Sequence, residues 1–296
     1  MRTLEYYHVD VFSDKRFSGN GLTVFTDAST LTSDEMLMIT REMRQFESVF
    51  LSSFSGNEIK ARVFTVEEEL DFAGHPVLGA SAVLHWLYAT DDSHKTWRFH
   101  LNKSAVTIET VIRNSKKGVS HENISATMNQ EVPEFGAILD DAATDHILKS
   151  LNLNAADLVD GHHPQMVSTG LPYLVLPLAT NAAKAKIVVH NLEEILSNYG
   201  AKFIGILDLP SFAIRTWNNS GTLEDVATGS LAGPVGAWLV ANGYKKYNEK
   251  FILNQGENLG RPSRLFVQVN KGVNGEVNVY VGGDVVYVGK GTLSLS

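Results

Sequence analysis

The 296-residue chain contains no cysteine. It can therefore form neither a disulfide framework nor a thiolate metal site, and no mechanism can use a cysteine as nucleophile or base. The ten histidines do not follow an HExxH or other ligand spacing, and the adjacent His162 and His163 precede Pro164, so their rings cannot share one helix face. The sequence therefore predicts no metal site.

The chain also lacks any block of lysine and arginine residues and any long apolar run. Its net charge is −8, with charges of both signs scattered along it, which argues against a nucleic-acid or membrane-surface partner. No segment reaches the roughly 18 apolar residues of a membrane span. The first residues lack the uninterrupted apolar stretch of a secretory signal. We expect a cytoplasmic protein that acts on small molecules.

Short alternating apolar segments and a few helical patterns predict a mixed α+β fold. Tyr6–Phe12 and Gly21–Phe25 are expected strands on either side of a tight turn, because Asn and Gly tolerate positive φ. A helix capped by Ser33 should follow and end near Gln45, with the next strand beginning at Ser48. The length of the chain is sufficient for two domains that each bury a core.

Two helices with almost no charge stand out, in the segments Glu69–Tyr88 and Glu224–Gly243. In both segments acidic residues are followed by a glycine, Gly74 or Gly229, and then by small and apolar residues only. The stretches FSGNGLTVF and STGLPYLVL give a second, weaker match between the two halves. We therefore expect two similar lobes: residues 1–120 with a returning strand at about 280–296, and residues 121–279.

A helix without a polar face needs apolar cover on every side, so each lobe should wrap a strongly curved sheet around its helix. Small residues along both helices would let the strands approach closely. If a two-fold relates the halves, both helix N-termini can face one cleft, where backbone N–H groups and helix dipoles favour an anion. The alternative is that the small residues only assist ordinary helix packing, and their repetition in both halves argues against it. A small anionic metabolite is the expected ligand.

Several blocks of the sequence resemble those of a known family. The blocks DVFSDKRFSGN, QFESVFLSS, ELDFAGHPVLGASAVL, STGLPYLVLPL, EDVATGSLAGPVGAWL, QGENLGRPSRL and VYVGGDVVYVGKGTL are similar, in order and over nearly the whole chain, to those of the PhzF family of phenazine-biosynthesis isomerase relatives. The resemblance implies the diaminopimelate-epimerase-like fold, with two pseudo-symmetric lobes that each wrap a sheet around a central helix. It also implies a homodimer without metal or organic cofactor.

The family pattern carries specific residue roles. Epimerases and proline racemases of this fold use two cysteines at the helix starts, which the composition excludes here. The resemblance implies instead that Glu47, in QFESVFL, carries the proton, and partial burial among apolar neighbours would raise its pKa into a useful range. The residues implied at the site are Glu47, His75 and Asp225 for catalysis and Gly74, Gly229 and Ser230 for substrate binding.

Each of these residues also has a purely structural interpretation. His75 and Pro76 suit the first turn of a helix, Asp225 suits a helix dipole, and Glu47 could be an exposed turn carboxylate. Gly21, Asp71 and Val226 stand where the family usually has proline, which bears on the substrate rather than on the fold. Three functions remain: a proton-shifting isomerase for a small cyclic amino or carboxylic acid, an epimerase that does not use cysteines, and a silent relative that binds an anionic metabolite.

Overall fold

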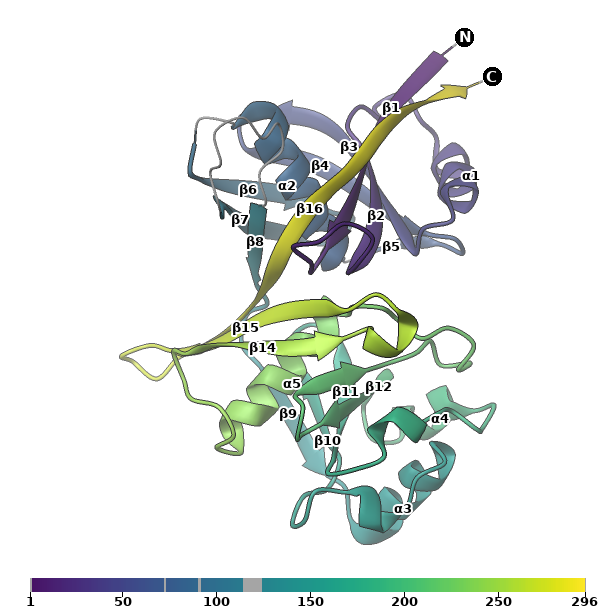
Figure 1. Ribbon diagram of the computed structural model, residues 1–296, viewed down its shortest axis with the longest axis vertical. Coiled ribbons are helices and arrows are strands. Elements are labelled where there is room, and N and C mark those ends of the chain that lie inside the picture. Colours follow the sequence, from purple (N-terminus) through teal and green to yellow (C-terminus); the bar gives the residue numbers. More distant parts are fainter. Residues whose placement is uncertain (1, 72, 90–91, 114–123, 296) are drawn as a thin grey trace. The chain divides into compact units, whose positions relative to one another are not determined.

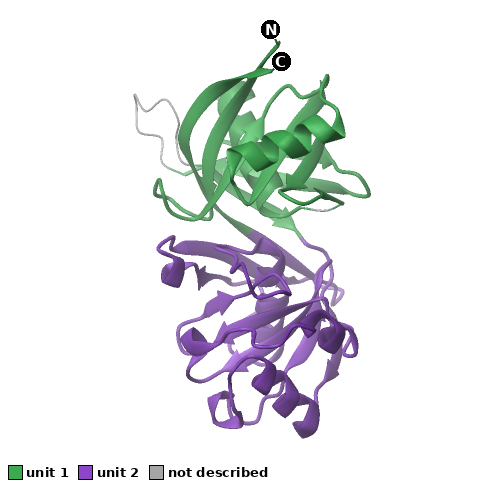
Figure 2. Ribbon diagram, turned by 90° about the vertical axis from the view of Figure 1, so that its right-hand side faces the viewer, with its two compact units in different colours: residues 1–129, 282–296 green, residues 130–281 purple. Residues whose placement is uncertain are grey.

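The computed structural model describes residues 2–71, 73–89, 92–113 and 124–295. The chain divides into two compact units, which Figure 2 shows in different colours. Unit 1 contains residues 1–129 and 282–296, and unit 2 contains residues 130–281. The expected boundary at residue 120 lies outside the described residues, and the expected boundary at residue 279 lies inside the last strand, β16 (Val277–Leu295).

Unit 1 is a sheet that surrounds one helix (Figure 1). Its elements are β1 (Arg2–Val11), β2 (Asn20–Phe25), α1 (Ser33–Met43), β3 (Glu47–Ser55), β4 (Glu58–Thr65), β5 (Glu69–Leu70), α2 (His75–Tyr88), β6 (His94–His100), β7 (Ala105–Ile112) and β8 (Ile124–Asn129). The strands follow the order β1-β2-β3-β4-β6-β7-β8. Because β16 lies beside β8 and also pairs with β1, the sheet closes around α2.

Unit 2 is also a sheet packed on one apolar helix. Its elements are β9 (Glu134–Ile138), α3 (Asp141–Ser150), η1 (Ala155–Asp157), β10 (Gln165–Ser168), β11 (Pro172–Leu178), η2 (Ala182–Lys184), α4 (Leu192–Ser197), β12 (Phe203–Asp208), β13 (Ala213–Arg215), α5 (Gly229–Ala241), β14 (Lys250–Gln255), η3 (Glu257–Leu259) and β15 (Ser263–Lys271). The strands follow the order β9-β10-β11-β12-β13-β14-β15-β16. Helix α5 packs on β10, β11, β12 and β15.

The two units repeat one pattern of strand pairing. In unit 1 the strand directions alternate from one pair to the next, beginning and ending with an antiparallel pair, along β1/β2, β2/β3, β3/β4, β4/β6 and β6/β7. In unit 2 the pairs β10/β11, β11/β12, β12/β13, β13/β14 and β14/β15 follow the same sequence of directions. The predicted α+β fold, with two similar lobes that each enclose an apolar helix, is confirmed.

Glycines let the sheets approach the central helices. A Cβ on Gly79 of α2 would collide with the side chain of Leu22 on β2. In α5, a Cβ on Gly233 would collide with the side-chain oxygen of Gln130, and one on Gly236 with Val267 of β15. The small residues therefore set the distance between helix and sheet in both units, as the sequence predicted.

The ends of α1 differ from the prediction. The N-cap is Thr32, not Ser33, because Thr32 and Glu35 form a capping box in which each side chain accepts from the other's backbone N–H. The helix ends at Met43 rather than near Gln45, since Arg44 adopts a left-handed conformation with φ 54°. The next strand consequently begins at Glu47, one residue earlier than expected.

No helix within the described ranges is both long and apolar enough to cross a membrane.

Candidate active site

The first candidate side chain, Glu47, is the first residue of β3 and faces α2. It pairs with Leu22 of the parallel strand β2. Because side chains alternate along a strand, Glu47 shares its face with Val49 and Leu51, which are completely buried. The side chain of Glu47 itself is 13% exposed. The strand therefore places a carboxylate at the edge of an apolar interior, which excludes the interpretation of an exposed turn residue.

His75 is the first residue of α2, directly after the N-cap Gly74 and before Pro76. Its Nδ1 atom lies 3.7 Å from the Glu47 Oε2 atom. Its Nε2 atom is buried and has no hydrogen-bond partner among the described residues. A buried polar atom without a partner is costly, and in native proteins it often marks a place where a ligand or water binds.

Burial lowers the pKa of His75 to about 3. The imidazole is therefore neutral at ordinary pH, and its contact with Glu47 is not an ion pair. The separation of 3.7 Å also exceeds a good hydrogen bond. A neutral ring beside the carboxylate adds no positive charge that would weaken Glu47 as a base.

The candidate residues of unit 2 lie at the start of α5. The N-cap Thr228 makes no side-chain cap, and its hydroxyl instead donates to Asp225 Oδ2 at 2.5 Å. The backbone N–H of Ala227 donates to the other carboxylate oxygen at 3.3 Å. Two groups of the loop that precedes α5 therefore hold the Asp225 carboxylate beside the start of the helix.

Ser230 lies in the first turn of α5, and its hydroxyl is 2.9 Å from the hydroxyl of Tyr173 on β11. The backbone N–H groups of Gly229 and Ser230 have no acceptor among the described residues, as expected for the first turn of a helix. Two hydroxyls and two backbone donors thus surround the start of α5. Such a group suits a carboxylate or another small anion.

Two residues at this end of unit 2 were missed from the sequence. Tyr173 is a buried phenol in an otherwise apolar strand, in the STGLPYLVL block. Gln255 ends β14, in the QGENLGRPSRL block, and its buried side chain contacts both Asp225 and Thr228. The only signal in the sequence was a polar residue within an apolar strand, which is too common to be specific.

A matching ion pair lies before each central helix. In unit 1, Arg62 of β4 binds Glu69 through two nitrogens, at 2.7 and 2.5 Å. In unit 2, Arg215 of β13 binds Glu224 through two nitrogens, at 2.7 and 2.8 Å. Both glutamates stand five residues before the glycine at the helix start, Gly74 or Gly229. The glutamate that the sequence repeats upstream of each helix is therefore explained by this pair.

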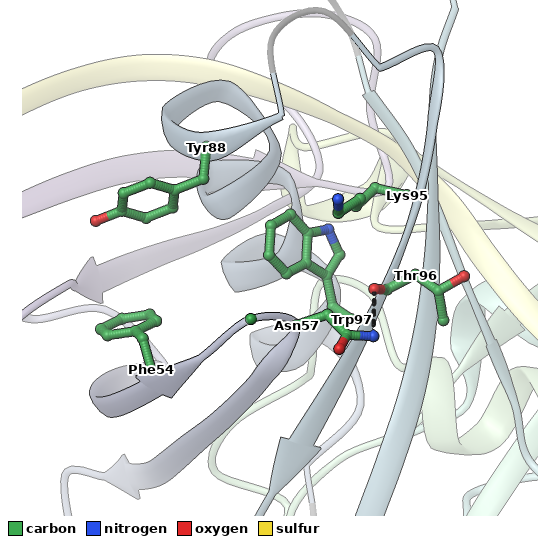
Figure 3. Close-up of a pocket in the computed structure, with 7 residues that line it drawn as sticks. Phe54, Asn57, Tyr88, Lys95, Thr96 and Trp97 are labelled. Carbon is green, nitrogen blue, oxygen red and sulfur yellow. Dashed lines mark hydrogen bonds between the residues drawn. The ribbon is translucent and has the colours of Figure 1, made fainter.

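A further pocket in unit 1 lies away from the start of α2. It measures about 700 Å³ and lies in unit 1 at the opposite end of α2 from His75, near Tyr88 (Figure 3). Phe54 and Tyr88 form its exposed aromatic side, and Lys95 is its one charged lining residue in the described part of the chain. Its described lining includes neither a carboxylate nor an imidazole, so we do not assign the chemistry to it.

The described residues include no group of three or more His, Asp or Glu side chains arranged to hold a metal ion. The six predicted site residues fall into two groups. Glu47, Gly74 and His75 meet at the start of α2 in unit 1. Asp225, Gly229 and Ser230 meet at the start of α5 in unit 2.

A duplicated fold in which polar side chains gather at the start of each apolar central helix is that of the diaminopimelate-epimerase-like isomerases, and this protein is an enzyme of that class. More particularly, the chain belongs to the family of phenazine biosynthesis-like proteins, PhzC-PhzF, whose family model matches residues 9–291. The predicted family is thereby confirmed.

Relatives and solved structures agree with this assignment. A trans-2,3-dihydro-3-hydroxyanthranilate isomerase from Pseudomonas fluorescens is 31% identical and covers 98% of this chain and 99% of its own. The structure of a predicted epimerase from Pseudomonas aeruginosa is 44% identical, with a TM-score of 0.88 over 99% of this chain and 100% of that one. A PhzF-family structure from Bacillus anthracis shares the fold at 22% identity, with a TM-score of 0.84 over the full length of both chains.

Proposed function

We propose that this isomerase moves a proton between two carbon atoms of a small cyclic amino or carboxylic acid, without a metal or an organic cofactor. The observation that carries the proposal is the contact at the start of α2. The Glu47 carboxylate lies 3.7 Å from a buried, neutral imidazole whose second nitrogen has no partner among the described residues. The substrate class also agrees with the relatives named trans-2,3-dihydro-3-hydroxyanthranilate isomerase.

Glu47 accepts a proton from one carbon and returns it to another. A carboxylate can do both, provided that its surroundings keep its basicity near the range that proton transfer requires. A protonated His75 would attract the negative charge and weaken the base, whereas the neutral ring leaves it available. The Nε2 atom of His75 can hydrogen-bond a polar group of the substrate, which would satisfy the buried nitrogen.

Binding of the substrate's carboxylate is assigned to the start of α5. Ser230 and Tyr173 supply hydroxyls there, and the first-turn N–H groups and the helix dipole add favourable interactions with a negative charge. Asp225, which accepts only when ionised, suits an ammonium or hydroxyl group of the same substrate. The chain therefore offers separate groups for the proton, the carboxylate and a donor substituent.

Incubation in D₂O with a panel of cyclic and acyclic amino acids and unsaturated ring acids tests the proposal. Deuterium at carbon, detected by mass spectrometry and NMR, is the expected result for at least one compound. Glu47→Gln keeps the shape of the side chain but removes its titratable proton, so it should reduce exchange by about 10² to 10⁴. Affinity for the same compound should change by less than about tenfold.

Glu67→Gln is the matched control, because it makes the same substitution at an exposed carboxylate on the loop after β4. It should leave exchange at the wild-type rate. Near-normal exchange in Glu47→Gln would show that another residue carries the proton. Loss of binding and of thermal stability together would show that Glu47 is structural.

A cysteine-free epimerase is the second candidate, favoured by the 44% identical structure described as a predicted epimerase. The two candidates differ in their products. An isomerase shifts a double bond and changes the ultraviolet spectrum, whereas an epimerase incorporates deuterium at a stereocentre and changes the optical rotation. Binding of panel compounds without any exchange would support a silent relative instead.

A further inference from the structure

The side chain of Gln255 is buried at the start of α5 and is only 3% exposed. Its Nε2 atom donates to the backbone carbonyl of Asp225 at 2.8 Å and to the Thr228 hydroxyl oxygen at 3.0 Å. Its Oε1 atom accepts from the backbone N–H of Thr228 at 2.8 Å. One amide group thus joins both ends of the four-residue loop that carries the Asp225 carboxylate to the helix.

The orientation of this amide is fixed by its backbone partners. The N–H of Thr228 can only donate, so the atom that faces it must be the side-chain oxygen of Gln255. The carbonyl of Asp225 can only accept, so the atom that faces it must be the nitrogen. A flipped amide would place two donors together and two acceptors together, and is excluded on these grounds.

The fixed amide in turn fixes the direction of the Thr228 hydroxyl. The Gln255 nitrogen has only hydrogens to offer, so the Thr228 oxygen must accept from it. The single hydroxyl proton is then directed to Asp225 Oδ2, 2.5 Å away. The chain of donors runs from the amide through the hydroxyl to the carboxylate, and the carboxylate remains an acceptor.

The turn after β14 supports the same loop. Gly256 adopts φ 79°, and a Cβ on it would collide with Arg261 O and lie 2.6 Å from Val226 O. Ser263 donates to the carbonyls of Val226 and Arg261 at 3.4 and 3.0 Å. The turn and the loop are therefore packed as one unit, and the position of Gln255 is determined by β14 and β15.

From these contacts we infer that Gln255 is a positioning residue for the isomerase reaction: through the Thr228 hydroxyl it orients the Asp225 carboxylate toward the substrate. The inference rests on the proposed function, because it assumes that Asp225 contacts the substrate. Within the described residues, the hydrogen bonds of the Gln255 side chain go to Asp225 and Thr228. Its effect on the reaction must therefore pass through Thr228 and Asp225.

Gln255→Glu tests the direction of the hydrogen bonds from Gln255 through Thr228 to Asp225, and it hardly changes the size of the side chain. An ionised carboxylate can only accept, so it would take the Thr228 proton away from Asp225 and face the Asp225 carbonyl unfavourably. Displacement of a positioned group by about 1 Å can cost roughly 100-fold in rate, so we expect deuterium exchange to fall by about 10- to 100-fold. The Gln268 side chain on β15 donates to Asn270 at 2.8 Å, so Gln268→Glu is the control and should keep the wild-type rate.

Thr228 provides the second arm, which does not depend on whether Gln255→Glu folds. Thr228→Val removes the hydroxyl but keeps the branched shape, and should lose exchange to the same extent as Gln255→Glu. Thr228→Ser keeps the hydroxyl and should lose less than Thr228→Val. In the double variant Gln255→Glu/Thr228→Val, exchange should be less than about threefold slower than in either single variant. The reason is that both substitutions break the same chain of contacts.

Thermal unfolding and crystal structures of the variants complete the experiment. We expect the Asp225 Oδ2 to Thr228 Oγ1 separation to exceed about 3.5 Å in Gln255→Glu. Additive losses of exchange in the double variant, or an Asp225 carboxylate that keeps its orientation in both single variants, would overturn the inference. If the wild type exchanges no compound, the proposed function fails, and the crystal structures still decide whether Gln255 orients Asp225.

Discussion

At the scale of the residue, His75 carries an energetic cost in the folded protein. It is an imidazole at the start of a helix, 7% exposed, with a buried nitrogen that the described residues do not satisfy. Such a group destabilises the folded protein, since burying an unpaired polar atom costs about 1–3 kcal/mol. Its presence is consistent with a site that is completed only when the substrate binds.

Acid should destabilise the protein through His75, and this is the first prediction. The pKa of His75 is lowered from 6.5 to about 3, so the unfolded chain binds a proton between these values while the folded chain does not. Stability is therefore lost as the pH falls below 6.5. From pH 7 to pH 5 this one group should lower the free energy of unfolding by about 2 kcal/mol.

His75→Gln removes the titration and gives the measurement. Free energies of unfolding in urea at pH 7 and pH 5 should show that the wild type loses about 2 kcal/mol more than His75→Gln over this interval. Comparing the change with pH, rather than the absolute stability, cancels the packing effect of the substitution. An equal loss in both proteins would mean that the imidazole is protonated in the folded state.

At the scale of the element, the loop before each central helix is held by an arginine–glutamate pair. The Arg62 guanidinium beside Glu69 holds the pKa of that carboxyl below its usual 4.5. Arg62 also lies 5.1 Å from the ring of Phe64, and Arg215 lies 4.6 Å from that of Trp217, in each case two residues further along the chain. In unit 1 the cation and the ring both lie on β4, and in unit 2 Arg215 ends β13 and Trp217 follows it. Each pair anchors the start of its helix.

Removing one member of an arginine–glutamate pair should lower the free energy of unfolding more than removing both members. Arg62→Leu leaves Glu69 partly buried without its partner, so we expect a loss of about 2–3 kcal/mol, which Arg62→Leu/Glu69→Leu should partly restore. Arg215→Leu should lose more than Arg62→Leu, because Arg215 also donates to the carbonyls of Ala182 and Ala185. Chemical denaturation of these three variants and the wild type gives the comparison.

The exposed pair between Lys149 and Asp145 in α3 is the control, since their side chains are 70% and 52% exposed. Lys149→Leu should change the free energy of unfolding by less than about 0.5 kcal/mol. If Arg62→Leu were equally harmless, the pair would not anchor the loop before α2.

At the scale of the whole molecule, the chain leaves unit 1 after β8 and returns to it through β16. The return is required because residues 285–295 pair with β1, while Gly282 packs against Ala126 and Thr127 of β8. Without β16, unit 1 would have two open strand edges. Unit 2 takes only residues 277–281 from this strand.

We therefore predict that residues 130–281 fold alone and unfold cooperatively, as followed by circular dichroism. Residues 1–129 alone should aggregate, because exposed edges of β1 and β8 can pair with other molecules. Joining residue 129 to residue 282 by a short glycine–serine linker should restore a monomeric, cooperatively folding unit 1. A soluble, folded fragment 1–129 would show that closure by β16 is dispensable.

The sequence alone determined the main architecture of this protein. A helix without charge can exist only inside an apolar shell, so the repeated segments around Gly74 and Gly229 required two lobes with a central helix. The absence of cysteine excluded two-thiol chemistry outright. The placement of Glu47 and His75 rested on family resemblance, and their roles are still predictions.

Only the tertiary structure decided how the site is held. Gln255 lies 30 residues from Asp225 in the sequence, and Tyr173 lies 57 residues from Ser230, so no periodicity joins either pair. The contacts arise because β14 and β11 both pass the start of α5, which depends on strand order and register. A local pattern specifies which face of an element is apolar, but the partner of a single buried polar side chain is chosen by the fold as a whole.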